Sequence, residues 1–281
     1  DHEAQKEGER KIEEDFAAIS NQMFFCEYKD TDHTIKLANP EHVPLEVLVQ
    51  QSSLCWESPL VDDFIAFDYK VINVGRDPLD DVYVGFWADC DIGPREQEEV
   101  AEDDYAGYWE GPLRAQVGVD FKTVKVSIGY MFDDDNDEGK SEGYVGLMFL
   151  GAQQPGGGAT SLGLKNFRFF SGKSSFDQGG DPNNDSERYL ILNGRAPRSL
   201  GPPPREEPFP VAKKKDDYRM VVSAGPFGSA SEVCQGDVCL MPGDTLGFQA
   251  ALVIGRFFEG MLDNAVQAQL TFDGAFLDCD E

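Results

Sequence analysis

Acidic side chains occur at two points where the sequence predicts that a strand ends. In the segment 79–93, LDDVYVGFWADCDIG, apolar residues recur at every second position, which places Asp89 and Asp91 together on the opposite face of one strand. The two carboxylates would be about 7 Å apart on an extended strand. Like charges at such a distance repel each other unless a cation or an arginine lies between them. The pair therefore predicts a bound Ca²⁺, with an arginine as the alternative.

The second acidic segment is DDDNDEG, residues 133–139. Counted from Asp134, its residues match positions 1, 3, 5 and 6 of an EF-hand-type loop, but position 12 is Val145 rather than glutamate. The segment is therefore not an EF-hand, and other ligands must complete a site. Oxygen ligands without a nearby histidine or cysteine favour Ca²⁺. The predicted ligands are Asp89, Asp91, Asp103, Asp104, Asp133, Asp134, Asp135, Asn136, Asp137 and Glu138. The alternative is a solvated acidic tip that protects an edge hairpin from aggregation.

The sequence contains no recognisable catalytic motif. Its three histidines are isolated, and it has no G-x-S-x-G, H-E-x-x-H or phosphate-binding glycine loop. We therefore expect a protein that is not an enzyme, with a glycoside hydrolase acting through two carboxylates as the alternative. Trp56, Tyr108 and Trp109 could stack on a sugar, or they could be core residues; Trp87 is expected in the core.

The chain of 281 residues has a formal net charge of −28. This charge argues against binding to nucleic acid or to anionic membranes, since both would repel it. It is compatible with divalent cations, with a basic partner, with a salty habitat, or simply with solubility. The apolar runs are too short for membrane insertion.

Six cysteines permit three disulfides without showing them. Cys234 and Cys239 enclose only four residues and predict a disulfide across a short loop, the alternative being two buried thiols. A disulfide would indicate an oxidising compartment. The chain begins at Asp1 without a signal-like segment, as expected for a mature exported protein, although a trimmed chain would look the same.

The spacing of apolar residues predicts a mainly β chain. Residues 1–21 form a charged extension in which an amphipathic helix is expected, packed on its own domain or on a neighbouring subunit. Residues 64–90 and 123–150 predict two hairpins, and residues 94–120, which lack periodicity, predict a long loop. Further strands are expected at 164–170, 219–227 and 245–255, and a helix at 257–272. Residues 176–192 predict a polar loop, with a short helix capped near Asp185 or Ser186 as a further expectation.

About ten short strands joined by turns predict a β-sandwich, jelly-roll-like or a supersandwich, with short N-terminal and C-terminal helices. We expect residues 22–281 to form a single domain. The proline-rich residues 196–210 would make an excursion across its surface.

The order of the segments DDFIAFDYKVINVG, LDDVYVGFWADCDIG, MVVSAGPF, MPGDTLGFQAALVIG and NAVQAQLTFDG resembles a group of secreted bacterial β-sandwich proteins. These proteins are often part of multidomain cell-surface proteins, and the similarity spans about residues 40–275. The resemblance implies fold and export, but no catalytic residue. We therefore expect an extracellular structural or adhesive subunit, stabilised by Ca²⁺, that binds other copies of itself or other surface proteins. The location would be secreted, at the cell surface, or periplasmic. The alternative is a carbohydrate-binding module or an accessory domain of a secreted hydrolase, with a polysaccharide ligand.

Overall fold

The computed structural model describes residues 20–31, 42–93, 102–133, 142–155, 159–161, 163–198 and 211–274. The chain is mainly β, as predicted, and its sheets are antiparallel. The expected N-terminal helix lies outside the described residues, and so does most of the proline-rich stretch.

The larger sheet has eight strands. Seven follow the spatial order β1-β2-β3-β13-β8-β7-β6, and β9 pairs with β8. Their bounds are β1 Gln22–Lys29, β2 Val47–Cys55, β3 Phe64–Asn73, β6 Asp104–Val117, β7 Asp120–Asp133, β8 Gly143–Gln153, β9 Ala159–Ser161 and β13 Thr245–Arg256. The predicted hairpin of residues 123–150 is confirmed, because β7 pairs with β8 from Ile128 opposite Met148 to Phe132 opposite Tyr144.

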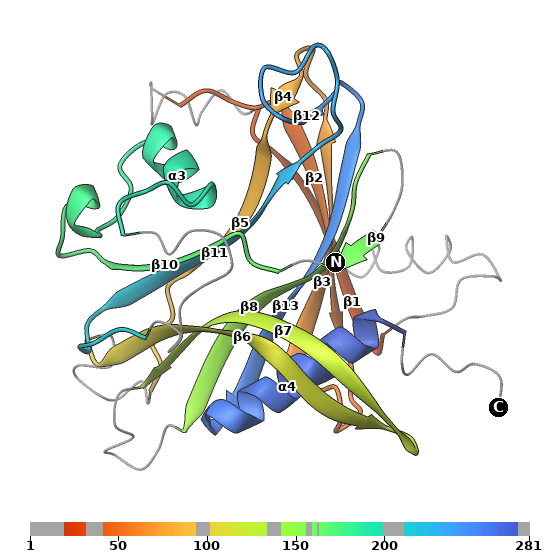
Figure 1. Cartoon of the computed structure of the whole chain (residues 1–281), viewed down its shortest axis with the longest axis vertical. Helices are drawn as coiled ribbons and strands as arrows, with labels where there is room; N and C mark the ends of the chain where they lie inside the picture. The colour runs from red at the N-terminus through yellow and green to blue at the C-terminus, as the bar shows by residue number, and fades with distance from the viewer. Residues whose placement is uncertain are drawn as a thin grey trace, which may run out of the picture.

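A smaller sheet with the order β10-β11-β5 packs on one face of the larger sheet (Figure 1). Its strands are β5 Val82–Ala88, β10 Asn166–Ser171 and β11 Tyr218–Phe227. Aromatic rings fill the space between the sheets: the ring of Phe86 lies 5.3 Å from that of Phe149 and 5.7 Å from that of Tyr69. A Cβ atom at Gly129 would lie 2.5 Å from Val222 Cγ1, so glycine permits the close approach of the sheets. This packing is the predicted β-sandwich.

Helices cover the two outer faces. The C-terminal helix α4, Phe257–Phe272, is confirmed at its predicted bounds and packs on the larger sheet opposite the smaller one. Its buried side chains recur at helical spacing, from Met261 to Leu270. The helix α3, Asp185–Leu192, and the 3₁₀-helix η1, Phe176–Gln178, pack on the smaller sheet. Asn184 caps α3 by accepting a hydrogen bond from the Glu187 N–H, one residue before the expected cap.

The hairpin predicted at residues 64–90 is wrong. Strand β3 pairs with β2 and β13, whereas β5 pairs with β11 in the other sheet. Between them, β4 Leu79–Asp80 pairs with β12 Cys239–Leu240. The chain thus passes from one layer to the other. Neighbouring strands of a sandwich commonly do so, and sequence proximity alone could not reveal it.

The long loop predicted at residues 94–120 is also wrong, because residues 104–117 form β6, which pairs with β7 along its whole length. The period of two is hidden because both faces of β6 carry large buried or partly buried rings. Tyr108 lies in the cluster between the sheets, and Trp109 packs in the cluster under α4. Pro112 is tolerated because β6 is the last strand of its sheet. In the described part of the chain, no helix is long and apolar enough to span a membrane.

Candidate functional site

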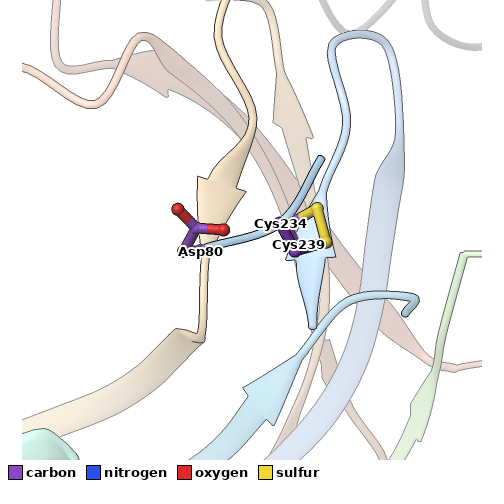
Figure 2. Close-up of side chains that lie close together, drawn as sticks. All are labelled: Asp80, Cys234 and Cys239. Carbon is purple, nitrogen blue, oxygen red and sulfur yellow. A yellow bond between two sulfur atoms is a disulfide. The ribbon is translucent and has the colours of Figure 1, made fainter. Parts of the chain in front are cut away.

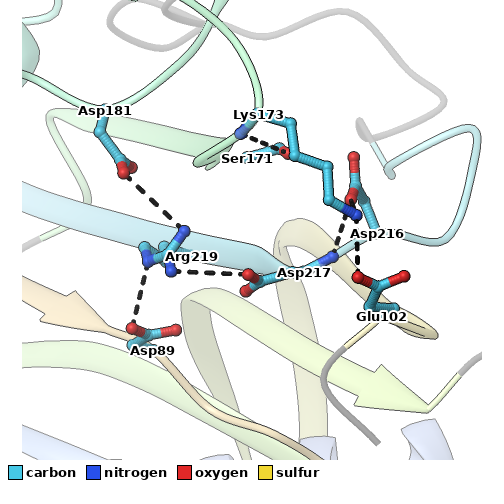
Figure 3. A network of polar contacts seen from close by, with 8 residues as sticks. All are labelled: Asp89, Glu102, Ser171, Lys173, Asp181, Asp216, Asp217 and Arg219. Atoms are coloured by element: carbon cyan, nitrogen blue, oxygen red, sulfur yellow. Dashed lines mark hydrogen bonds and ion pairs between the residues drawn. The ribbon is translucent and has the colours of Figure 1, made fainter. Parts of the chain in front are cut away.

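The carboxylate of Asp89 is held by an arginine. Asp89 follows the end of β5, and its Oδ2 atom accepts a hydrogen bond from Arg219 Nε at 3.1 Å. The same guanidinium lies 3.6 Å from Asp217 Oδ2 and 3.8 Å from Asp181 Oδ2 (Figure 3). These three carboxylates raise the pKa of Arg219, although partial burial opposes the shift. The repulsion expected at the end of β5 is therefore offset at Asp89 by an arginine, the alternative to a metal ion.

A lysine binds the next pair of carboxylates. Lys173 Nζ lies 3.0 Å from Asp216 Oδ1 and 3.3 Å from Glu102 Oε1 (Figure 3). Burial raises the pKa of Asp216, but the hydrogen bonds from Lys173 and Ser171 outweigh it and hold the pKa below its usual value. Asp216 precedes Asp217 just before the start of β11, so the Lys173 and Arg219 groups are neighbours and bind adjacent carboxylates.

A second set of carboxylates is buried where β6 begins and β7 ends. Asp103, Asp104 and Asp133 are buried, and Asp104 lies directly opposite Asp133 in the β6–β7 ladder. Asp104 Oδ1 accepts a hydrogen bond from the Ile92 N–H at 3.2 Å, just beyond Asp91. Its Oδ2 is buried without a hydrogen-bond partner in the described part of the chain. The structure thus brings Asp91, Asp103, Asp104 and Asp133 to one corner.

Asp104 has a strongly shifted pKa. Burial is the largest cause, and the negative charges of Asp103, Asp91 and Asp133 add to it. The hydrogen bond from Ile92 acts in the opposite direction, and the resulting pKa of Asp104 is about 8. Near neutral pH this carboxyl group therefore holds a proton for much of the time unless a cation replaces it.

Among the described residues, one group of three possible metal ligands has its ligand atoms within 4.8 Å of one another. It consists of Asp80, Cys234 and Cys239, and it does not lie at the Asp104 corner (Figure 2). The two sulfur atoms of that group form a disulfide, so neither is available to a metal ion. Residues 134–138, the other predicted ligands, lie outside the described residues.

The disulfide Cys234–Cys239 is confirmed, with its Cα atoms 5.6 Å apart. Two neighbouring carboxylates hold its loop through backbone N–H groups. Asp80 Oδ1 accepts from Gln235 at 2.8 Å, and Asp81 Oδ1 accepts from Asp237 at 3.1 Å. These two acidic residues thus have a structural role that their sequence position did not indicate.

The predicted sugar-stacking residues do not share a surface. Tyr108 is fully buried between the sheets, whereas Trp56 and Trp109 pack against the cluster on the α4 side of the larger sheet. Trp87, expected in the core, is instead 47% exposed on the outer face of the smaller sheet, where its ring lies 4.6 Å from that of Phe170. Strand β5 is an edge strand, which explains this exposure.

The sequence predicts an extended segment at MFFCEY, which is β1, but its exposed position at the edge of the larger sheet was not predicted. All eight residues of β1 are exposed, and its large apolar side chains are 48–61% exposed at Met23, Phe24, Phe25 and Tyr28. Strand β1 pairs with β2 alone, so its other edge bonds to no strand in the described part of the chain. The adjacent phenylalanines were the available signal, because consecutive large apolar residues point to opposite faces of a strand.

The comparisons with known proteins give no family. No family model matches the chain, and no curated protein matches it. Among solved structures, a putative aldose 1-epimerase from Escherichia coli K12 aligns over 86% of this chain and 68% of its own, with 8% identity and a TM-score of 0.37. A likeness at this level carries no argument about function, so a function has to be inferred from the chain's own residues.

Proposed function

We propose that this protein is an extracellular assembly module that pairs with a second copy of itself through the free edge of β1. The observation that supports it is the complete exposure of that strand, with large apolar side chains on both faces. Soluble proteins normally protect such edges with charges, prolines or covering loops. An apolar edge left open in this way favours pairing with another strand.

The order of residues in β1 indicates that its partner is the β1 strand of a second copy. Two β1 strands placed antiparallel about Cys26 would bring the two Cys26 residues opposite each other and each Phe24 opposite Tyr28 of the second copy. Cross-strand aromatic pairs of this kind contribute roughly 0.2–1 kcal/mol each. Cys26 is an exposed free thiol. The pairing therefore joins aromatic side chains on the face that carries Phe24 and Tyr28 and places a thiol at its centre, whereas on the other face Phe25 lies opposite Glu27 of the second copy.

The proposed location is outside the cytosol. The Cys234–Cys239 disulfide supports an oxidising compartment, in which a thiol at a symmetric strand pair forms an interchain disulfide. The resemblance to secreted bacterial surface proteins supports the same location.

Sedimentation velocity and non-reducing gels test the pairing. We expect a dimer, part of it covalent, and Cys26→Ser to abolish the covalent part while leaving reversible association. Adding Phe24→Glu to Cys26→Ser should weaken that association at least about tenfold, because a carboxylate then lies opposite Tyr28 of the second copy in the apolar contact. Val119→Glu is the matched control, since Val119 is 92% exposed at the turn between β6 and β7. A wild-type protein that stays monomeric under oxidising conditions would refute the pairing.

We also propose that Ca²⁺ binds at the corner of Asp91, Asp103, Asp104 and Asp133, with further ligands from residues 134–138. The buried, unbonded Oδ2 of Asp104 supports it, because a cation would offset the burial of negative charge there. Thermal unfolding in Ca²⁺ and in chelator tests the proposal: Ca²⁺ should raise Tm, and Asp104→Asn should remove most of the rise. Superimposable melting curves of the wild type would contradict it.

A further inference from the structure

A cavity of about 460 Å³ opens along β10, the edge strand of the smaller sheet. Its walls come from β10, from the turn around η1, and from the segment 211–218 that leads into β11. Its volume is within the usual range of small-molecule sites, about 300–1,000 Å³. The cavity shares no residue with β1 and does not depend on the proposed assembly.

A buried arginine lines this cavity. Arg168 is 1% exposed, and its Nη2 atom donates to the carbonyl oxygens of Phe176 at 3.1 Å and Gly180 at 3.2 Å. Its Nε and Nη1 atoms are buried without a hydrogen-bond partner among the described residues. No carboxylate of the described chain lies within ion-pair distance of this guanidinium, unlike Arg219 nearby. A buried cation with unused donors is costly unless an anion approaches it.

The rest of the lining is also basic, in a chain whose net charge is −28. Arg198, Lys213 and Lys214 join Arg168, whereas Asp216 is the one acidic residue of the lining among the residues that the structure describes. Asp216 is already bound to Lys173 at 3.0 Å. Arg198 lies near enough to oppose the charge of Arg168, since burial and then Arg198 lower the pKa of Arg168. The cavity is thus a local reversal of charge: none of these four cations forms an ion pair within the described residues, although Asp181 and Glu187 lie near enough to act on the charge of Arg168.

The remaining lining residues suit an organic ligand rather than an inorganic ion. Phe169 and Tyr218, whose rings lie 5.3 Å apart, contribute partly exposed ring surfaces, and Ser171, Ser174 and Gln178 contribute groups that can bond to hydroxyls. Inorganic phosphate would leave the rings without contacts. A hydroxylated ring that carries an anionic group would use all three kinds of wall.

We infer that this cavity binds a small anionic sugar, with the carboxylate or phosphate on Arg168 and the sugar ring between the aromatic and hydroxyl-bearing walls. Guanidinium groups bind carboxylate and phosphate through the same charge-assisted hydrogen bonds, so the two kinds of sugar share one chemistry.

Calorimetric titration of the full chain distinguishes a sugar carboxylate from a sugar phosphate. The probes are D-glucuronate, D-glucose 6-phosphate, neutral D-glucose and inorganic phosphate. We expect at least one anionic sugar to bind at least about tenfold more tightly than both glucose and phosphate. Binding of glucuronate alone assigns a carboxylate, and binding of the phosphate ester alone assigns a phosphate. Equal binding of inorganic phosphate, or no binding of any probe at about 10 mM, overturns the inference.

Substitutions locate the binding. Arg168→Met, which keeps the volume of the side chain, should weaken binding at least about tenfold, with its fold checked by circular dichroism. The double variant Lys213→Gln/Lys214→Gln, at two exposed positions, should weaken binding about threefold or more without affecting the fold. If Arg168→Met does not fold, this double variant tests the location of the site. Lys122→Gln, an exposed lysine on β7, is the matched control and should bind as the wild type does. Wild-type affinity in Arg168→Met, or in the double variant, overturns the inference.

Discussion

The Asp104 carboxyl group shows how burial changes the chemistry of a single acidic residue. Its neighbours Asp91, Asp103 and Asp133 supply negative charge, and its own Oδ2 has no hydrogen-bond partner in the described residues. A pKa of about 8 means that the folded chain binds a proton there at pH values where the unfolded chain does not. Without a bound cation, the ionised form of Asp104 therefore destabilises the fold, and protonation removes that cost.

The pH dependence of unfolding tests this state of Asp104. In chelator, the free energy of unfolding should decrease as pH rises from about 4, near the unfolded pKa, to about 8, near the folded pKa. Asp104→Asn keeps the shape without the charge, so it should flatten this slope and be more stable than the wild type at pH 8 by about 1–3 kcal/mol. Urea titrations between these pH values measure it. Asp62→Asn, at an exposed position, is the control, and an unchanged slope in Asp104→Asn would contradict the assignment.

Other acidic residues have structural partners that explain part of the negative charge. Asp30 accepts hydrogen bonds from the backbone N–H groups of Leu45 and Val47, and Asp244 accepts one from Met241. Such bonds satisfy backbone donors where strands end and turns begin. Acidic residues next to turns are therefore not all candidates for metal binding, although their spacing in the sequence resembles that of ligands.

Among the elements, α4 has the strongest agreement between pattern and packing. Its apolar residues recur at the helical period, and its buried face covers β13, β8 and β7 of the larger sheet. A Cβ atom at Gly255 would lie 2.2 Å from the Met261 nitrogen, so glycine permits the chain to turn sharply from β13 into the helix. The helix therefore forms one outer layer of the domain rather than a loose extension.

Truncation of a buried side chain measures that packing. Leu270→Ala should lower the free energy of unfolding by about 2–5 kcal/mol, because Leu270 is fully buried and its removal leaves a cavity. Asp263→Ala, at an exposed position of the same helix, should change it by less than about 0.5 kcal/mol. Chemical denaturation of both variants gives the comparison. A loss in Leu270→Ala no larger than in the control would mean that α4 is not packed as described.

Whether the residue pattern of an element is visible in the sequence explains which elements could be predicted and which could not. The helix α4, with one covered face, has a visible period, and both α4 and the apolar central strand β13, which is covered on both faces, were predicted at nearly their observed bounds. Strand β6 has rings packed on both faces, and β5 joins a sheet different from that of β3, so neither relation appears in local spacing. The arginine at Asp89 comes from β11, 130 residues further along the chain, which local spacing also cannot show.

At the scale of the whole molecule, the layers leave one part of the larger sheet uncovered. The clusters beneath α4 and the smaller sheet centre on β13, β8 and β7, whereas β1 lies at the far end beyond β2 and β3. Its apolar side chains are therefore exposed, because neither α4 nor the smaller sheet, the layers of the described residues, extends over them. Yet the chain carries a formal net charge of −28, so two copies repel each other at long range. The proposed dimer must overcome this repulsion through short-range apolar contacts.

A change in ionic strength distinguishes the charge repulsion between two copies from the apolar contacts between them. The Debye length falls from about 30 Å at 0.01 M salt to about 8 Å at 0.15 M, which screens the charge but leaves apolar contacts intact. In Cys26→Ser, which removes the covalent contribution, association should therefore strengthen at least about tenfold between low salt and physiological salt. Sedimentation equilibrium at several NaCl concentrations measures the change, and Cys26→Ser/Phe24→Glu should remain mostly monomeric throughout. Dissociation on adding salt would instead indicate an interface held by ion pairs, which the exposed aromatic edge of β1 does not provide.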